Sequence, residues 1–460
     1  MNGDSRSMRP INAFGFLFLL FSLSCVSREF SNAMKMAETG DKTAQNEIGD
    51  RYRKGNGIGK DYSKAISWYE KSANQGFAPA QVSLGEMYAT GQGVSLDFSK
   101  AVDFYQKAAE QGDGNGESNL GRMYLIGHGL TQNYTKALFW FQKAVAQGNP
   151  RAQARLGGMY LNGCGVKQDA VTAMTLIHKS SDQGSSYGQY YMGSIYEEGK
   201  GGPQDYAQAF KWYQKGADQG DSTCQTRLGI LYEHGRGVPQ NFKKALKWFQ
   251  KASEQEDTNG QNELGYMYLS GKGSQVDYHQ AFLLFKKTAE KSDAYGESAL
   301  ASLYMNGNYL PKDYLKAANW FNKSAEQGDS RAQACLGWLY LKGEGVLQNQ
   351  PLGLKWTHKS ADQNDVEGLT QLGTCYEEGE GVEQDYSQAL KYFQKASDLG
   401  DSTGDKLLGN MYEKGEGVFQ SSARALEYYR KASKDSGPDS RNTSSEKNGT
   451  SSPLRMLLGG

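Results

Sequence analysis

The sequence predicts an all-α protein: an α/α solenoid of eleven 36-residue two-helix repeats that forms a superhelix, followed by a disordered C-terminal tail. A tyrosine returns every 36 residues from Tyr52 to Tyr412, without an insertion or a deletion. A glycine keeps the same period from Gly55 to Gly415. A fixed period of roughly 20–50 residues indicates stacked units that cannot bury their apolar faces alone.

The first residues predict entry into the secretory pathway. Residues 13–26 form an apolar run that follows Arg6 and Arg9. This run is shorter than the roughly 20 residues of a membrane-spanning helix, but it has the length of a signal-peptide core. We therefore predict a signal peptide at residues 1–27 and a secreted or endoplasmic-reticulum-lumenal protein. The alternatives are an uncleaved anchor and a cytoplasmic protein with an incidental apolar start.

Residues 28–42 have the pattern of half a repeat. Lys35 falls in the register of Lys71, on what would be the second helix of a repeat whose first helix is missing. A half-repeat of this kind closes the end of a solenoid. We therefore predict an N-terminal cap helix at residues 28–42, followed by the repeat array at 43–434.

The first helix of each repeat is predicted from its apolar spacing. In the first copy, at residues 43–54, Ala44 and Ile48 share one face at 3.6 residues per turn. Gly49 lies beside that face, although a glycine inside a helix costs about 1 kcal/mol relative to alanine. The glycine returns in ten of the eleven copies, and Ala301 is the exception. This recurrence predicts the close approach of a neighbouring helix.

The second helix is predicted from the residues that border it. Gly55 and Gly57 end the first helix, because glycine adopts the left-handed conformation at a helix C-terminus without a side-chain penalty. Asp61 then precedes the second helix, at residues 62–75, as an N-cap that accepts backbone N–H bonds.

A longer period indicates that part of the array was duplicated. RAQARLG at 151–157 returns as RAQACLG at 331–337, an offset of 180 residues or five repeats. We infer that block 79–258 was copied to make 259–438. Residues 435–460 are rich in serine, asparagine and glycine and are predicted to be disordered.

Composition and charge limit the possible functions. Lysine plus arginine and aspartate plus glutamate balance at 51 each, so no overall field attracts nucleic acid, and none is predicted as a partner. The five cysteines show no recurring pairing and are interpreted as buried thiols. We find no histidine–cysteine cluster for a metal and no catalytic constellation beyond the repeat itself. The sequence therefore predicts a protein that is not an enzyme and has no cofactor.

The repeat pattern LGxMYxxGxGVxxDYxKAxxWYxKAAxQG is nearly intact at 84–112 and 228–256. It resembles the Sel-one-like repeat family of tetratricopeptide-like α/α solenoids, and the resemblance covers 43–434. This implies an adaptor role, because family members include lumenal subunits of endoplasmic-reticulum-associated degradation, activators of chitin synthase and secreted bacterial cysteine-rich proteins. The sequence shows no C-terminal membrane span, unlike the first group, and no cysteine pair in each repeat, unlike the last.

One face of the first helices varies between repeats and is the predicted binding surface. It comprises the registers of Asn46, Asp50 and Arg53, with their neighbours. In tetratricopeptide-like solenoids this face lines the concave groove, and exposed aromatic residues anchor protein interfaces. The alternative is extra packing between repeats. The apolar candidates are Tyr190, Tyr191, Ile230, Tyr266 and Trp338, and the acidic candidates at the rim are Glu197 and Glu233.

These observations together predict a non-catalytic scaffold or adaptor that binds segments of protein partners in the concave groove. The alternative is a non-catalytic activator or regulatory subunit of an enzyme complex. Beyond the signal segment, no stable insertion into a membrane is expected.

Overall fold

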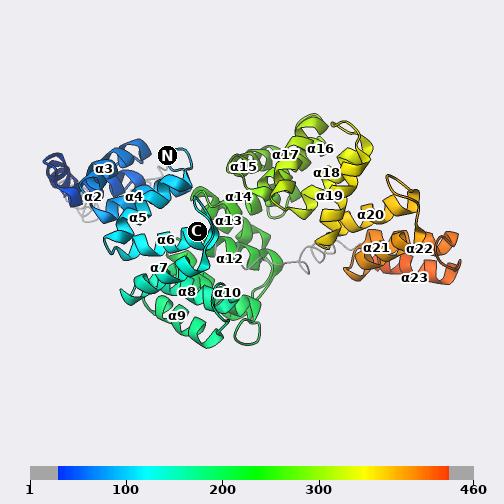
Figure 1. Ribbon diagram of the computed structural model, residues 1–460, viewed down its shortest axis with the longest axis horizontal. Helices are drawn as coiled ribbons and strands as arrows, with labels where there is room; N and C mark the ends of the chain where they lie inside the picture. Colours follow the sequence, from blue (N-terminus) through cyan, green and yellow to red (C-terminus); the bar gives the residue numbers. More distant parts are fainter. Residues whose placement is uncertain (1–28, 435–460) are drawn as a thin grey trace, which may run out of the picture. The chain divides into compact units, whose positions relative to one another are not determined.

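The structure is a computed structural model, and it describes residues 29–434 of the 460-residue chain. The described residues form helices and connecting turns, without a strand. The helices follow one another in pairs (Figure 1), so the predicted α/α solenoid is confirmed. The predicted signal peptide at 1–27 and the predicted tail at 435–460 lie outside the described residues.

Each repeat contributes two helices of 13 residues. The first helices are α2 (Lys42–Lys54), α4 (Ala78–Thr90), α6 (Gly114–Ile126), α8 (Pro150–Asn162), α10 (Ser186–Glu198), α12 (Ser222–His234), α14 (Thr258–Ser270), α16 (Ala294–Asn306), α18 (Ser330–Lys342), α20 (Val366–Glu378) and α22 (Ser402–Lys414). The second helices are α3 (Tyr62–Asn74), α5 (Phe98–Glu110), α7 (Tyr134–Ala146), α9 (Ala170–Asp182), α11 (Tyr206–Asp218), α13 (Phe242–Glu254), α15 (Tyr278–Glu290), α17 (Tyr314–Glu326), α19 (Gln350–Asp362), α21 (Tyr386–Asp398) and α23 (Ser422–Lys434).

The chain divides into two compact units, unit 1 (Met1–Asp205) and unit 2 (Tyr206–Gly460). The boundary falls inside the fifth repeat, between α10 and α11. Within unit 1 each helix from α2 to α10 packs against the next, and the same holds from α11 to α23 within unit 2. The first helices of neighbouring repeats also contact each other, as α8 contacts α10 and α18 contacts α20.

The helix ends follow from local sequence. Asp61 accepts a hydrogen bond from the backbone N–H of Lys64 at 3.0 Å, which confirms it as an N-cap. Gly55 ends α2 in the left-handed conformation, at φ 75°. Asp41 caps α2 by accepting from Ala44 N–H at 2.7 Å, a second capping position that the sequence analysis did not identify. Both helices of repeat one therefore begin at a side-chain cap, whereas α4 and α10 begin without a side-chain cap bond.

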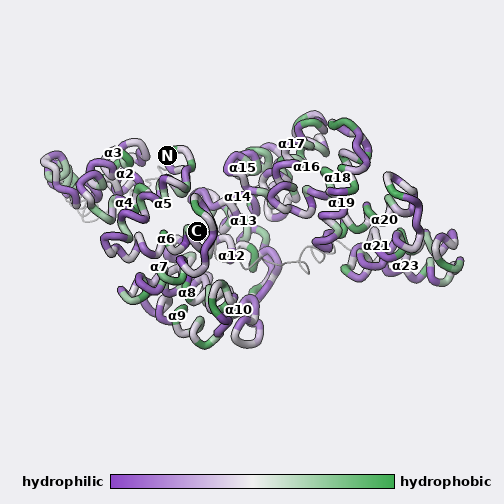
Figure 2. The backbone as a smooth tube through the Cα atoms, viewed as in Figure 1, coloured by the Kyte–Doolittle hydropathy of each residue, from purple (hydrophilic) through white to green (hydrophobic). Residues whose placement is uncertain are grey.

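The recurring helix glycine brings the two helices of a repeat into close contact. A Cβ atom on Gly49 would lie 2.6 Å from Cδ1 of Tyr69, so the ring of α3 rests on the backbone of α2. This confirms the predicted close approach. Apolar and polar residues alternate along the helices (Figure 2), and the rings at the Tyr69 register form the core. The fully buried rings at this register are Tyr69, Tyr105, Phe141, Tyr213, Phe249, Phe285, Phe321 and Phe393.

Repeat eight departs from this pattern. Ala301 replaces the helix glycine and is completely buried. Tyr309 stands where other repeats have a left-handed glycine such as Gly273 (φ 75°), and within the described residues it is not among the non-glycine residues of positive φ. Its ring instead lies 5.2 Å from that of His279 and 5.5 Å from that of Phe282. Here aromatic packing against the preceding repeat replaces a left-handed turn.

A polar bridge closes most repeats at one end. In repeat one, Gln75 Nε2 donates to Gln45 Oε1 at 2.8 Å, and similar glutamine pairs recur along the chain. In repeats three and eight the acceptor is Glu117 or Glu297. Gln147 donates to Glu117 at 2.8 Å. The bridge therefore exists in a neutral and an ionisable form.

A helix at residues 29–38 precedes the array. Its buried Ala33 and Ala37 pack against Ala44 and Ile48 of α2. This helix corresponds to the predicted N-terminal half-repeat. In the described part of the chain, no helix is both long and apolar enough to cross a membrane.

Candidate functional site

A groove in unit 2 has the features of a binding site. Its volume is about 630 Å³, and residues of α16, α18, α20 and α22 line it. These are the first helices of repeats eight to eleven, and the start of α17 adds Tyr314. Because successive repeats line the groove together, it exists only in the stacked array.

Trp338 of α18 provides the largest side chain of the groove. The next residue, Leu339, is completely buried in the core, whereas Trp338 is half-buried. Its ring centroid lies 6.4 Å from that of Tyr314. Met305 and Leu341 also line the groove. The result is an apolar surface that contains two aromatic rings, the kind of surface on which interface energy concentrates.

Polar groups accompany the apolar surface. Thr370 and Thr374 of α20 line the groove, and their hydroxyls donate to carbonyls of their own helix, at 2.8 and 3.0 Å. Lys342 donates to Glu380 at 2.8 Å. The groove therefore presents charges of both signs together with hydroxyl acceptors, a mixture that suits a polypeptide better than a polyanion.

Glu367 is an ionisable residue of the same wall. Its side chain keeps contact with solvent, but the protein atoms crowded around it in the groove desolvate it and raise the pKa of its carboxyl. Arg331 acts in the opposite direction by attracting the carboxylate. The groove thus contains a carboxylate that an arginine of the same chain attracts.

Two cysteines line the groove without the character of nucleophiles. Burial raises the pKa of the Cys335 thiol to about 12, and the same cause raises that of Cys375 to about 12. At these pKa values both thiols are protonated at neutral pH. They are therefore weakly nucleophilic, because the thiolate is the reactive form. Among residues 29–434, no group of three potential metal ligands occurs.

The predicted exposure of Tyr190 and Tyr191 is wrong. They are 5% and 4% exposed, on α10 of unit 1, and their rings contact each other at 5.4 Å. The physical reason is that first helices of neighbouring repeats pack side by side, as α8 and α10 do. The registers of Asn46 and Glu47 then face the adjoining helix, so the alternative of packing between repeats holds for these two tyrosines.

The predicted exposure of Glu233 is also wrong. It is 3% exposed, and Lys272 donates to it at 3.0 Å, so it does not form an open acidic rim. The ammonium group of Lys272 lies 5.2 Å from the ring centroid of half-buried Tyr266. Ile230 packs against the core cluster that contains Phe249. Among these unit 2 candidates, the structure brings Glu233 and Tyr266 together, through one lysine.

The two remaining candidates, Glu197 and Trp338, lie in different units. Glu197 is half-buried at the end of α10 in unit 1, whereas Trp338 lies in the groove of unit 2. Three residues of the groove, Tyr314, Thr370 and Thr374, were not among the candidates predicted from the sequence. Thr374 shares the register of Tyr266 and Trp338, and it lies one repeat after Trp338 and three after Tyr266. The predicted register was therefore correct, but its polar members were not predicted.

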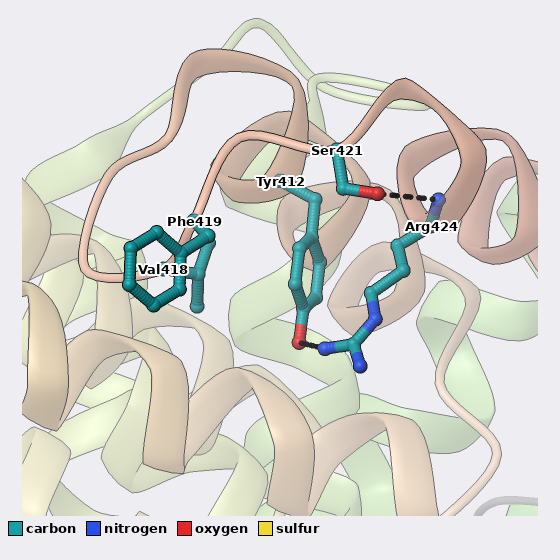
Figure 3. A pocket seen from close by; sticks show the side chains of 5 residues that line it. All are labelled: Tyr412, Val418, Phe419, Ser421 and Arg424. Carbon is teal, nitrogen blue, oxygen red and sulfur yellow. Dashed lines mark hydrogen bonds between the residues drawn. The ribbon is translucent and has the colours of Figure 1, made fainter.

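A second, smaller pocket of about 290 Å³ lies in the last repeat (Figure 3). Tyr412, Val418, Phe419, Ser421 and Arg424 line it. Arg424 donates to the Tyr412 hydroxyl at 3.2 Å, and the Tyr412 ring stacks on Tyr428. In inner repeats the glycine turn of the following repeat packs on the first residue of the second helix, as Gly93 does on Tyr62, whereas α23 is the last helix that the structure describes. The pocket thus marks the last repeat among the described residues.

The sequence matches the Sel1 repeat family along the whole array. The matched residues are 42–77, 78–113, 115–149, 150–185, 186–221, 222–257, 258–293, 294–329, 330–365, 366–401 and 407–436. A comparison with curated proteins gives no match.

Solved structures show the same relationship. The chain is similar to c5321, a protective antigen present in uropathogenic Escherichia coli strains that displays an SLR fold, with 32% identity over 93% of this chain and 92% of that chain and a TM-score of 0.52. A Sel1 repeat protein from Oxalobacter formigenes is 28% identical over 53% of this chain and 96% of its own, with a TM-score of 0.48. The chain therefore belongs to the Sel1 repeat family.

Proposed function

We propose that this protein is a non-catalytic scaffold that binds a segment of a protein partner in the groove around Trp338. The observation that carries the proposal is a groove of about 630 Å³ lined by four successive first helices, with a half-buried tryptophan in it. Sel1 repeat solenoids commonly act as protein-interaction scaffolds.

The composition of the groove supports a polypeptide as the occupant. Trp338 and Tyr314 offer aromatic surface for an apolar side chain, and aromatic anchors supply much of the energy of protein interfaces. Thr370 and Thr374 lie beside them with hydroxyl oxygens that can accept hydrogen bonds from a backbone. The paired Lys342 and Glu380 give the groove no net charge of one sign.

A photo-cross-linking experiment tests this proposal. A photoreactive amino acid replaces Thr374, which lines the groove, and in a matched control it replaces Lys247, an exposed residue of α13. Both full-length proteins are irradiated in extract of the native host, and cross-linked peptides are mapped. We expect one recurring partner segment from the Thr374 position and none of that segment from the Lys247 position.

The recovered segment then allows a direct measurement. Trp338→Ala should weaken its binding at least about tenfold, because truncating an interface anchor costs about 2 kcal/mol or more. Trp248→Ala is the control, since Trp248 is a half-buried tryptophan on a second helix outside the groove. Equal affinity of the Trp338→Ala variant and the parent, with both folded, contradicts the proposal.

We also propose that the protein enters the secretory pathway, on the basis of the apolar run at residues 13–26. N-terminal sequencing of protein from its own host tests this, and its expected outcome is given in the Discussion.

A further inference from the structure

Unit 1 carries an unusual concentration of arginine on its first helices. Arg53 of α2 pairs with Glu86 of α4 at 2.8 Å, and Arg151 of α8 reaches across α6 to the same glutamate at 3.5 Å. Arg122 and Arg151 both repel the charge of Arg155. We refer to Arg122, Arg151 and Arg155 as the arginine cluster. Glu86 thus forms ion pairs with the guanidinium groups of both Arg53 and Arg151.

Arg155 is the buried member of the cluster. It is 2% exposed, and its Nη1 donates to the carbonyl and hydroxyl oxygens of Ser118 at 3.5 and 3.3 Å. Its guanidinium lies 5.0 Å from the ring centroid of Tyr187. Within the described chain no carboxylate pairs with it. A guanidinium has five N–H donors, so most of this buried group's donors lack a protein acceptor.

The environment of Arg155 works against its charge. Burial, together with the neighbouring Arg122 and Arg151, lowers the pKa of Arg155 to about 10. The group remains protonated at neutral pH nevertheless. Burying a charge without a counter-charge is costly, so a residue of this kind needs either a structural benefit or a ligand that supplies the missing charge.

The equivalent place in unit 2 shows what is missing. By the 36-residue period, Arg151 corresponds to Arg331 and Tyr187 corresponds to Glu367. In unit 2 the arginine and the glutamate attract each other, and a cysteine stands at the register of Arg155. Arg122 corresponds to Ser302, and Glu86 corresponds to Tyr266. At these positions unit 1 therefore has two arginines more than unit 2 and the same number of carboxylates. Unit 2 has one carboxylate for one arginine, whereas unit 1 has one carboxylate, which Arg53 and Arg151 already share, for the three arginines of the cluster.

We infer that the arginine cluster of unit 1 is a binding subsite for a carboxylate side chain of an acidic polypeptide segment. This inference rests on the proposed function as a polypeptide-binding scaffold and adds the chemistry of one partner segment. The planar guanidinium of Arg155 can bind a carboxylate through two parallel hydrogen bonds. Arg151, which is 43% exposed in its side chain, can turn from Glu86 to the incoming group while Arg53 keeps the shorter bond.

Two features favour a carboxylate over a phosphate-bearing chain. Nucleic acids are bound by exposed stripes of cations that follow the backbone, whereas Arg155 is almost fully buried and Glu86 lies on the same wall. The Tyr187 ring covers one face of the guanidinium, which leaves its edge for a planar group. A single carboxylate fits such an edge and would give Arg155 a negative neighbour, as Glu367 attracts Arg331 in unit 2.

The test uses the full-length protein and fluorescein-labelled peptides in a polarisation assay. The probe peptide consists of repeated Glu-Gly-Ser units, and two matched peptides carry glutamine or phosphoserine in place of glutamate. The variants are Arg155→Met, which removes the buried charge, and Tyr187→Glu, which places a carboxylate where unit 2 has one. Arg331→Met is the matched control, because the Glu367 carboxylate of the same chain already attracts Arg331. Melting temperatures are measured for all of them.

We expect the glutamate peptide to bind the parent protein at least tenfold more tightly than the glutamine peptide, with affinity falling as salt rises. Arg155→Met and Tyr187→Glu should each lower that affinity at least tenfold without lowering the melting temperature, whereas Arg331→Met should retain it. A solely structural role for Arg155 would instead lower the melting temperature of Arg155→Met.

Three results would overturn the inference: equal binding of the glutamate and glutamine peptides, undiminished binding by Arg155→Met or Tyr187→Glu, or tighter binding of the phosphoserine peptide. If Arg155→Met does not fold, Tyr187→Glu decides alone. Trp338→Ala should retain binding of the glutamate peptide, because Trp338 belongs to unit 2. A negative result for the arginine cluster therefore does not contradict the proposed groove in unit 2, which the cross-linking experiment tests separately.

Discussion

Gly265 in α14 offers a sharp test of how the repeats are packed. An added Cβ would lie 2.7 Å from Cε1 and 2.9 Å from Cζ of Phe285, which is 1% exposed. Ordinary carbon contacts begin near 3.5 Å, so Gly265→Ala requires the ring or the helix to move by roughly 0.7 Å. The ring cannot turn into solvent, because Ala281, Ala289 and other core residues surround it.

Two opposing effects determine how much Gly265→Ala changes the free energy of unfolding. Overfilling a well-packed core costs about 1–3 kcal/mol. Replacing a glycine inside a helix by alanine stabilises the helix by about 1 kcal/mol. The single variant is therefore expected to lose between about 0 and 2 kcal/mol. In a Phe285→Val background, which lacks both ring atoms, only the helix gain should remain, so the coupling between the two positions should be about 1–3 kcal/mol.

Hydrogen exchange of α14 and α15 is the suitable assay, because an array of repeats does not unfold as one two-state unit. Opening free energies are compared among the parent, Gly265→Ala, Phe285→Val and the double variant. Ala301→Gly serves as the reverse control, since repeat eight already accommodates a Cβ at this register and should lose about 1 kcal/mol. Stabilisation by Gly265→Ala of equal size in both backgrounds would refute the close-packing argument.

Two further predictions concern charge and processing. Burial raises the pKa of Glu117 above its ordinary 4.5, so the folded state holds this proton more tightly than the unfolded state, and stability is lost as pH rises through the raised value. Glu117→Gln, which restores the glutamine pair of other repeats, should therefore raise the melting temperature at neutral pH but leave it unchanged below pH 4.5, as thermal melts at the two pH values will show. If residues 13–26 are a signal core, protein from its own host should begin between Cys25 and Glu29, whereas a cytosolic chain that starts at Met1 would contradict secretion.

Local structure was predictable from residues that act on their own backbone. Asp61 caps a helix through a bond to an N–H three residues later, and Gly55 ends one through a left-handed φ. Such interactions involve neighbours in sequence, and the 36-residue period repeats them. The recurrence of the glycine at the Gly49 register predicted a close contact with another helix, but only the structure identified Tyr69 as the side chain that makes this contact.

The binding surface could not be predicted in the same way. Helical periodicity states which residues share a face, but it does not distinguish a face that meets solvent from one that meets the next helix. Tyr190 and Trp338 both looked exposed by register, yet the first is buried between repeats and the second lines a groove. The difference depends on how neighbouring first helices pack against each other.

The charge pattern of the two units separates what the sequence determined from what the tertiary structure decided. The sequence by itself determined the period, the ends of the helices and the correspondence of Arg151 with Arg331. Only the tertiary structure decided that Arg155 is buried without a paired carboxylate while Glu367 is attracted by Arg331. The physical reason is that the charge balance of a buried group depends on side chains one or more repeats away, whose approach is set by the stacking of helices and not by the local sequence.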